Sequence, residues 1–240
     1  QTAYMNMAID ESVLFHVNQN MVLPTLRLYS WKPNAVSVGY FQSLKDEVDL
    51  NACKTFGIDY VRRITGGGAV YHDNEITYSF ISKSEDVPAK ILDSYRYIAG
   101  GVIKGLLKLG VKAEFVPLND IISSGKKISG NAQTRRYSCV LQHGTILIDV
   151  DVSKMFRLLL IPDEKIRDKM IATVSERVTC VNRILGRIIE FDEGAGAIIE
   201  GFQEVFGVPF FRGELLKSES LMAKTLAETK YSKDEWNFKR

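Results

Sequence analysis

The sequence predicts an α+β protein in which mixed or antiparallel sheets are packed with helices. Short runs of alternating apolar and polar residues, typical of half-buried strands, recur between residues 25 and 150. Single long helical stripes interrupt these runs, and the last third is mostly helical. The chain has 240 residues, 45% of them hydrophobic, which suits one large domain with a sizeable core.

In the first half, helices are predicted from periodicity and from stop residues. Apolar residues recur every four positions from Met5 to Val17, which predicts an amphipathic helix. A short helix is expected at residues 49–56, ended by Gly57. Lys32-Pro33-Asn34 is expected to be a turn that joins the first two strands. Strands are predicted at residues 25–30, 35–40, 59–64 and 76–80.

In the second half, one strong helical stripe runs from Tyr95 to Leu107 and stops at Gly110. A second helix carries Ile198, Phe202 and neighbouring apolar residues on one face, and ends at Gly207. Strands separated by turns are predicted at residues 113–116, 121–123, 127–133, 139–143 and 145–150.

Charge and cysteine content exclude several classes of protein. The 31 basic and 29 acidic residues give a net charge of +2, whereas a dedicated nucleic-acid protein usually shows a stronger basic bias. Cys53, Cys139 and Cys180 are widely spaced and form no CxxC pair, so neither a disulfide framework nor a zinc site is indicated. No apolar run approaches a membrane span, and no signal-peptide pattern is present. We therefore expect a cytoplasmic protein without nucleic-acid or membrane partners.

The most informative stretch is residues 62–73, Arg-Arg-Ile-Thr-Gly-Gly-Gly-Ala-Val-Tyr-His-Asp. Gly66, Gly67 and Gly68 reach positive φ at little cost, so successive N–H groups can converge on an anion. Arg62 and Arg63 stand just before them, and arginine keeps its charge at any working pH. The stretch predicts an anion-binding turn between two strands.

A second charged motif, Lys-Lys-Ile-Ser-Gly-Asn-Ala-Gln, occupies residues 126–133. A lysine pair before a strand is, by itself, usually a solvated surface. His72 fits a ligand loop and a strand end equally well, and His143, in a strand before Gly144, is more often an interior histidine. Together, the two motifs predict an anionic ligand held by backbone donors and fixed cations.

These motifs resemble those of the lipoate–protein ligase family. RRITGGGAVYHD is similar to its arginine–triple-glycine signature, and KISGNAQ to its lysine signature. Further similar segments run over most of the chain: AYMNMAIDESVL, LRLYSWKPNAVSVGYFQ, LND, QHGTILID and RVTCVN. The resemblance implies the fold shared by biotin and lipoate ligases, with residues 1–240 forming a single catalytic domain.

The resemblance also implies an ATP-dependent ligase that converts lipoate to lipoyl-AMP and passes the lipoyl group to a protein lysine. Lys127 would be catalytic, contacting the acyl carbonyl and the α-phosphate, while Arg62 would hold phosphate. Mg²⁺ would accompany the leaving pyrophosphate, with Asp120 as its candidate ligand. The site for ATP and lipoyl-adenylate would comprise Arg62, Arg63, Gly66, Gly67, Gly68, Ala69, Val70, Tyr71, His72, Asn119, Asp120 and Lys127.

The implied partners are proteins that carry a lipoyl-acceptor lysine: E2 subunits of 2-oxoacid dehydrogenases and the glycine-cleavage H protein. Family members with the full architecture continue past an E-W-N-aromatic-G-x-P-x-F junction into an accessory domain. Residues 234–240 read Asp-Glu-Trp-Asn-Phe-Lys-Arg, without the junction's glycine and proline. We expect this domain to be absent and a small separate polypeptide to replace it; a truncated chain is the alternative.

Other activities stay open as alternatives. An octanoyltransferase of the same fold works without ATP through a cysteine, which relatives carry before the lysine strand or after a proline that follows the QHG strand. Here those places read Val-Pro-Leu-Asn-Asp at residues 116–120 and Ile-Pro-Asp-Glu at residues 161–164, without cysteine. A biotin–protein ligase would carry a GRGRxG-type loop, which is absent. A non-catalytic lipoate-binding module would need no ATP cradle.

Overall fold

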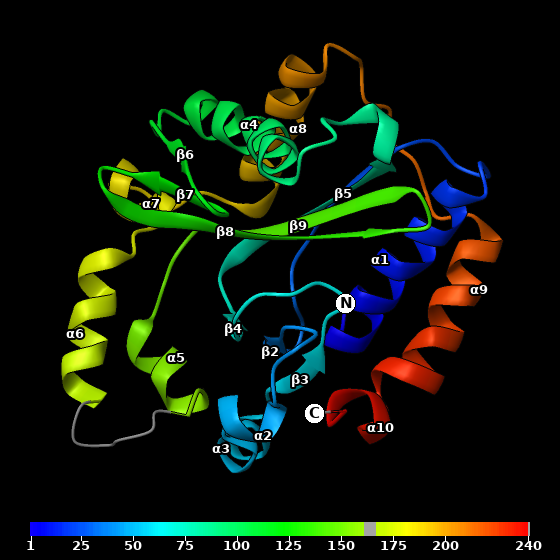
Figure 1. The fold of residues 1–240 in the computed structure, drawn as a ribbon. Helices are drawn as coiled ribbons and strands as arrows, with labels where there is room; N and C mark the ends of the chain where they lie inside the picture. Colours follow the sequence, from blue (N-terminus) through cyan, green and yellow to red (C-terminus); the bar gives the residue numbers. More distant parts are fainter. Residues whose placement is uncertain (161–166, 240) are drawn as a thin grey trace.

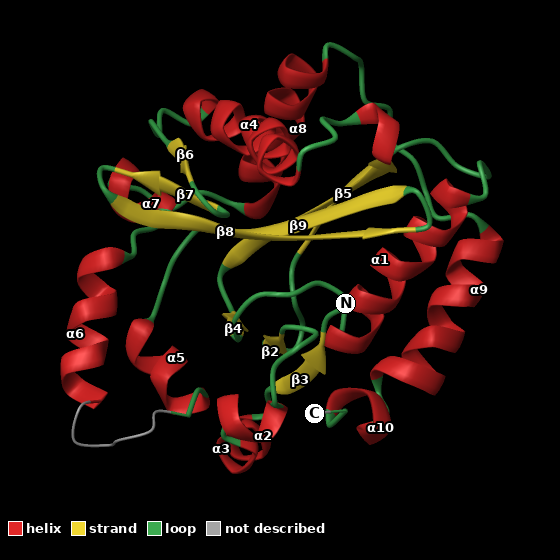
Figure 2. Cartoon of the chain, viewed as in Figure 1, coloured by secondary structure: helices red, strands yellow, loops and turns green. Residues whose placement is uncertain are grey.

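The computed structural model describes residues 1–160 and 167–239, which form two sheets covered by helices (Figures 1 and 2). The larger sheet has the strand order β1 (Thr25–Tyr29), β5 (Glu75–Lys83), β9 (Cys139–Leu147), β8 (Lys126–Arg136), β7 (Asp120–Ser123) and β6 (Glu114–Val116). The smaller sheet has the order β3 (Asp59–Arg62), β2 (Ala35–Val38) and β4 (Val70–His72). All neighbours in the larger sheet are antiparallel. In the smaller sheet β2 pairs parallel with β3 and antiparallel with β4, so the predicted α+β class is confirmed.

The two faces of the larger sheet have different neighbours. Along β5, Ile76, Tyr78 and Phe80 pack with helices α4 (Ile91–Lys108) and α8 (Phe191–Phe206), which lie together on one face (Figure 1). On the opposite face, Ile81 and Leu141 pack with helix α1 (Ala3–Asn18). Successive side chains of a strand point to opposite faces, so one alternating sequence serves both layers. The smaller sheet lies on the α1 side of the larger one (Figure 1).

Further helical elements complete the described part of the chain. They are α2 (Leu44–Glu47), α3 (Leu50–Phe56), the 3₁₀ turn η1 (Ser84–Asp86), α5 (Val152–Leu158), α6 (Arg167–Arg177), α7 (Val181–Leu185), α9 (Lys217–Leu226), the π-helical turn η3 (Ala227–Tyr231) and α10 (Asp234–Asn237). Helix α3 begins and ends as predicted: the Asp49 carboxylate accepts from the Ala52 amide, and Gly57 closes the helix at φ 64°.

Some local predictions were wrong. Lys32-Pro33-Asn34 connects β1 and β2 as predicted, but the two strands belong to different sheets and do not pair. Helix α1 was predicted to be amphipathic, but it is buried on most sides, and polar residues such as Asn6 and Asp10 are buried along with the apolar ones. The two short strands expected at residues 139–143 and 145–150 form one strand, β9, because Gly144 continues the pairing with β5 and β8.

The C-terminal helices bring the end of the chain close to its beginning. The Ser12 hydroxyl of α1 donates to the Glu219 carbonyl of α9 (2.9 Å), and the Tyr231 hydroxyl donates to Glu11 (2.5 Å). Helix α10 then reaches β3, the strand that leads into the three glycines. The segment that was expected to bind an anion therefore lies between the two sheets and beside the C-terminal helix.

Candidate acyl-donor site

A cavity of about 290 Å³ lies where the two sheets face each other. It is lined from the larger sheet by β1, β5, β8 and β9, from the smaller sheet by β2 and β4, and by Met7 of α1. The predicted site residues that line it are Arg63, Gly67, Gly68, Ala69, Val70, His72, Asn119 and Lys127. A cavity of this size, largely apolar with a few converging polar groups, is typical of a small-molecule site.

The glycine loop, residues 63–69, connects β3 to β4. Of the three glycines, only Gly67 adopts the positive φ that glycine reaches at little cost, 98°. The loop packs closely against Gly39, because a Cβ at that position would lie 2.0 Å from the Gly67 carbonyl oxygen. A Cβ on Gly66 or Gly68 would meet open space. The loop is therefore fixed at Gly67 and open on either side.

Arg63 turns the carbonyl groups of the loop inward. Its Nη2 donates to the Gly66 and Gly68 carbonyls (2.9 and 3.1 Å), Nη1 to the Ser37 carbonyl and hydroxyl, and Nε to the Thr65 hydroxyl. All five donors are thus used inside the protein. Burial lowers the pKa of Arg63 to about 10, so the side chain remains charged at neutral pH.

The loop amides are left available. The N–H groups of residues 66–69 form no hydrogen bond with any other residue in the described part of the chain, and Gly67, Gly68 and Ala69 line the cavity. Successive free amides above a buried guanidinium form a concave site for an anion. Anion binding by this turn stays a prediction, with which the unpaired amides are consistent.

Arg62 lies elsewhere, and the structure does not bring it to the cavity. It is fully buried on the other side of β3, where its guanidinium donates to backbone carbonyls. The acceptors are the carbonyls of Gly39, Tyr40, Gln42, Trp236 and Asn237. The prediction that Arg62 holds phosphate was wrong in its geometry, because alternate residues of a strand face opposite sides.

Lys127 is the cation that remains accessible. Its Nζ lies 2.7 Å from Asp120 Oδ1 on the neighbouring strand β7, and its side chain is 42% exposed. Gly130 makes room for it, since a Cβ there would lie 3.0 Å from Lys127 Cε. The Lys127 carbonyl accepts from the Thr179 amide, which anchors the predicted RVTCVN segment beside this strand. The lysine and glycine-loop motifs thus meet at one cavity.

Asn119 and Asp120 differ in placement. Asn119 lines the cavity and is tied to β8: its Nδ2 donates to the Asn131 carbonyl (2.5 Å), and Asn131 Nδ2 donates back (2.8 Å). Asp120 is neutralised by Lys127, and no group of three His, Cys, Asp or Glu side chains suited to a metal occurs among residues 1–160 and 167–239. Mg²⁺ commonly binds one carboxylate together with phosphates. The role of Asp120 as its ligand therefore stays a prediction, and the ion pair with Lys127 disfavours it.

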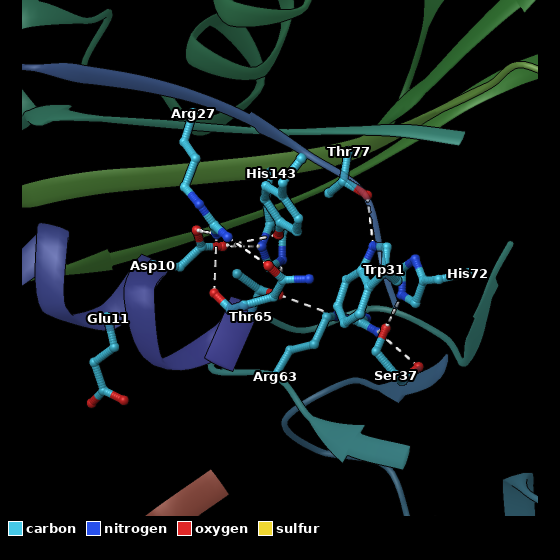
Figure 3. Close-up of polar contacts among 12 residues, drawn as sticks. Asp10, Glu11, Arg27, Trp31, Ser37, Arg63, Thr65, His72, Thr77 and His143 are labelled. Carbon is cyan, nitrogen blue, oxygen red and sulfur yellow. Dashed lines mark hydrogen bonds and ion pairs between the residues drawn. The ribbon is translucent and has the colours of Figure 1, made fainter. Parts of the chain in front are cut away.

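His72 lines the cavity and belongs to a chain of polar contacts (Figure 3). Its ring stacks on Trp31 at 3.9 Å between centroids, and Nδ1 lies 2.7 Å from the Glu75 carboxylate. Ser37 Oγ, which accepts from Arg63, lies 2.6 Å from His72 Nε2. A carboxylate only accepts, so the neutral ring carries its hydrogen on Nδ1 and accepts from Ser37 at Nε2.

His143 repeats this arrangement on the other side of Arg63 (Figure 3). Nδ1 lies 3.2 Å from Asp10, which is also paired with Arg27 at 2.9 Å, and Nε2 lies 2.7 Å from the Thr65 hydroxyl. Burial lowers the pKa of His143, which favours the neutral ring. The expectation of an interior histidine is confirmed, although His143 also lines the cavity.

Several lining residues were not predicted from the sequence: Met7, Tyr29, Trp31, Ser37 and Thr77. The supporting residues Asp10, Arg27 and Thr65 were missed as well. The sequence did offer one signal for Asp10, because a carboxylate within an otherwise apolar helix indicates a buried polar contact. Conversely, Tyr71 does not line the cavity; its hydroxyl accepts from Asn34, on the face of β4 away from Val70 and His72.

The three cysteines lack the features of a nucleophilic cysteine. All are buried and free, and none lines the cavity. Burial raises the pKa of Cys53 to about 11 and raises the pKa values of Cys139 and Cys180. A nucleophilic cysteine needs the opposite shift. Residues 161–164, where some relatives were expected to carry a cysteine, lie outside the described residues; their sequence holds none.

Comparison with known proteins identifies the family. The model of the lipoyl protein ligase A/B catalytic domain matches residues 2–203. The chain belongs to the lipoyl protein ligase A/B catalytic domain family. This match includes both motifs and every cavity-lining residue, and it confirms the resemblance seen in the sequence.

Within this family, relatives of both activities are similar over nearly the full chain. The octanoyltransferases LipM of Bacillus subtilis and Symbiobacterium thermophilum are 35% and 37% identical, each covering 98% of this chain and 94% of the relative. A bi-partite lipoate protein ligase from Thermoplasma acidophilum is 34% identical with a TM-score of 0.88, covering 98% of this chain and 91% of that one. A lipoate-protein ligase A bound with ATP is 31% identical with a TM-score of 0.83, covering 99% and 94%. The predicted fold is thereby confirmed. No described helix is long and apolar enough to cross a bilayer.

Proposed function

We propose that this protein acylates one lysine of a lipoyl-acceptor domain with a lipoyl or octanoyl group. The cavity supplies an apolar chamber for a medium-length acyl chain, lined by Met7, Tyr29 and Leu147 among others. Lys127 and the free loop amides stand at the same cavity and suit the anionic end of an activated acyl donor. Family membership supports this class of reaction.

For the activation step, we propose an acyl-adenylate made from lipoate and MgATP. The observation that carries this choice is the absence of cysteine from the cavity lining, with all three cysteines buried and their pKa values raised. An adenylate route needs no protein nucleophile. Likeness to a lipoate-protein ligase A bound with ATP supports it.

In the first step a lipoate oxygen attacks the α-phosphate, and pyrophosphate leaves with the electrons of the broken P–O bond. In the second step the uncharged target amine attacks the acyl carbonyl, AMP leaves, and one proton passes to solvent. Lys127 would stabilise the negative charge on the carbonyl oxygen and α-phosphate, and the amides of residues 66–69 would hold phosphate oxygens. Arg63 would act through the field of its buried charge.

A second candidate is octanoyl transfer without ATP. The names of the curated relatives favour it over ATP-dependent ligation, at 35–37% identity over nearly full length. Because no cysteine lines the cavity, the uncharged target amine would attack the thioester carbonyl directly, and the C–S bond would break to release the thiol of the donor. Lys127 and the loop amides would then stabilise the tetrahedral intermediate.

The proposed acceptor is the lipoyl domain of an E2 subunit, with the glycine-cleavage H protein as a further candidate. The E2 lipoyl domain is supported by the similarity of this chain to the bi-partite ligase from Thermoplasma acidophilum, which was studied together with its E2 lipoyl domain. The same likeness supports the proposal that a second polypeptide completes the adenylation step.

The test offers three donors to the purified chain: lipoate with MgATP, presynthesised lipoyl-AMP, and an octanoyl thioester of a carrier protein. Each is incubated with an apo E2 lipoyl domain, with and without a candidate second polypeptide, and the acceptor is weighed by intact mass spectrometry. Transfer from lipoyl-AMP but not from the thioester is expected. Transfer only from the thioester would establish the second candidate, and unchanged acceptor mass with every donor would refute both.

A further inference from the structure

Arg62 joins three segments that are far apart in the sequence. It is fully buried in β3, directly before the glycine loop. Its guanidinium binds carbonyls of residues 39–42 on one side and of helix α10 on the other. The contacts with α10 span 174 and 175 positions of sequence.

Helix α10 holds both the backbone and the side chain of Arg62. Asn237 Oδ1 accepts from the Arg62 amide (2.8 Å), and the Asn237 carbonyl accepts from Nη2 (2.7 Å). Trp236 Nε1 donates to the Arg62 carbonyl (2.9 Å), while the Trp236 carbonyl accepts from Nε (3.0 Å). Asn237 is itself fixed, because its Nδ2 donates to the Tyr231 carbonyl (2.8 Å).

On the opposite side, Nη1 of Arg62 draws together a tight turn. It donates to the carbonyls of Gly39 (3.0 Å), Tyr40 (3.1 Å) and Gln42 (2.6 Å). The Gly39 amide also donates to Gln42 Oε1 (2.9 Å), which closes the turn. Several neutral carbonyls facing one point are stabilised by a cation there, and the rigid guanidinium fork can serve them all.

This turn lies directly against the glycine loop. The Tyr40 amide donates to the Thr65 carbonyl (2.8 Å), and the Arg63 amide donates to the Val38 carbonyl (2.9 Å). The backbones of Gly39 and Gly67 approach so closely that no side chain fits between them. A shift of the turn at residues 39–42 must therefore move Gly67, which lines the cavity.

We propose that Trp236 and Asn237 are positioning residues for the reaction: through Arg62 and the turn at residues 39–42, they hold the glycine loop in its working geometry. This inference rests on the proposed function, in which the loop amides bind the acyl donor. Removing an α10 contact leaves a buried polar group of Arg62 without its partner, and relaxation of that group loosens the turn. Neither residue needs to touch the donor.

The test uses Asn237→Ala, Trp236→Phe and the matched control Glu235→Ala, whose side chain is exposed on the same short helix. Amide hydrogen exchange at Tyr40 and Arg63, measured by NMR on the ligand-free 27.0 kDa chain, reports the turn and the loop. Transfer from lipoyl-AMP to the apo lipoyl domain is measured in parallel, well below the unfolding temperature of each variant. Trp236→Phe keeps an aromatic side chain and removes the Nε1 donor, so it tests the coupling if Asn237→Ala fails to fold.

Both α10 variants are expected to exchange the Tyr40 and Arg63 amides about tenfold faster. We expect kcat for transfer to fall by about tenfold to a hundredfold, because small displacements of a donor site are costly, while Glu235→Ala changes neither quantity. Faster exchange confined to α10, or faster exchange at Tyr40 and Arg63 with unchanged kcat, would overturn the inference. Failure of the proposed function would give a different result, because the wild-type chain itself would transfer nothing. Amide exchange at Tyr40 and Arg63 would then still show whether α10 is coupled to the turn and the glycine loop.

Discussion

Replacement of Lys127 by alanine tests the centre of the proposed mechanism. Among the described cavity-lining residues, Arg63 and Lys127 carry fixed positive charge. Arg63 is buried and all five of its N–H donors are used within the protein. Lys127 is 42% exposed and held by a single ion pair with Asp120. An incoming carbonyl or phosphate oxygen can therefore be bound by Lys127 without breaking the fold.

The expected effects on activity and on stability differ widely in size. Removing a preorganised charge donor lowers kcat by about 10²–10³-fold. The Lys127–Asp120 pair is 42% and 35% exposed, so its loss costs at most about 1 kcal/mol of unfolding free energy. For a chain of this length, that corresponds to a fall in Tm of about 2–4 °C. Lys127→Ala should thus remain folded while losing nearly all transfer.

The assay measures single-turnover transfer from lipoyl-AMP to an apo lipoyl domain, with Tm measured on the same samples. Lys126→Ala is the matched control, since adjacent residues of β8 point to opposite faces and Lys126 does not line the cavity. Equal losses in the two variants would refute the assignment, and so would a Lys127→Ala rate within about threefold of wild type.

Three further predictions follow from the site. A variant with all three cysteines replaced by alanine should keep most transfer per folded molecule, and a trapped acyl-thioester on the wild-type chain would contradict this. Gly67→Ala should cost about 1–3 kcal/mol by urea denaturation because φ is 98°, whereas Gly68→Ala should fold normally and weaken donor binding in calorimetry. Because burial lowers the folded-state pKa of His143, the unfolded chain takes up a proton first as pH falls below about 6.5, and stability decreases there. His143→Gln should flatten the dependence of unfolding free energy on pH between about pH 7 and 5; an unchanged slope would exclude this explanation.

The sequence predicts most of the fold where local pattern is sufficient. The stripe from Tyr95 to Leu107 became α4, and the run up to Gly207 became α8, because 3.6-residue periodicity records a single buried face. The same rule failed for α1, which is enclosed by the larger sheet on one side and α9 on another. A helix buried on most sides has no polar face for periodicity to report.

The candidate site was predicted only in part, for a related reason. Glycines and a lysine in fixed motifs mark the loop and the strand at the cavity, since both are local features. The pairing of Asp10 with His143 spans 133 positions, and no local signal announces it. Arg62 was assigned to phosphate because its charge is visible in the sequence, whereas the carbonyls that bind it are not.

The two adjacent arginines show how charge can shape an anion site without touching the anion. Each binds backbone carbonyls, which a planar guanidinium does better than an ammonium because its donors are spread along a rigid fork. Arg63 binds the Gly66 and Gly68 carbonyls, while the loop amides have no hydrogen-bond partner in the described part of the chain. Ser37 and Thr65 accept from Arg63 and lie within hydrogen-bond distance of His72 and His143, whose other nitrogens face Glu75 and Asp10. The guanidinium is thus held from both sides by hydroxyl groups that contact histidines backed by carboxylates, which explains why a buried cation can be kept at this position. A donor that enters the cavity meets unpaired loop amides and one accessible cation, Lys127, so the reorganisation left for the reaction is small.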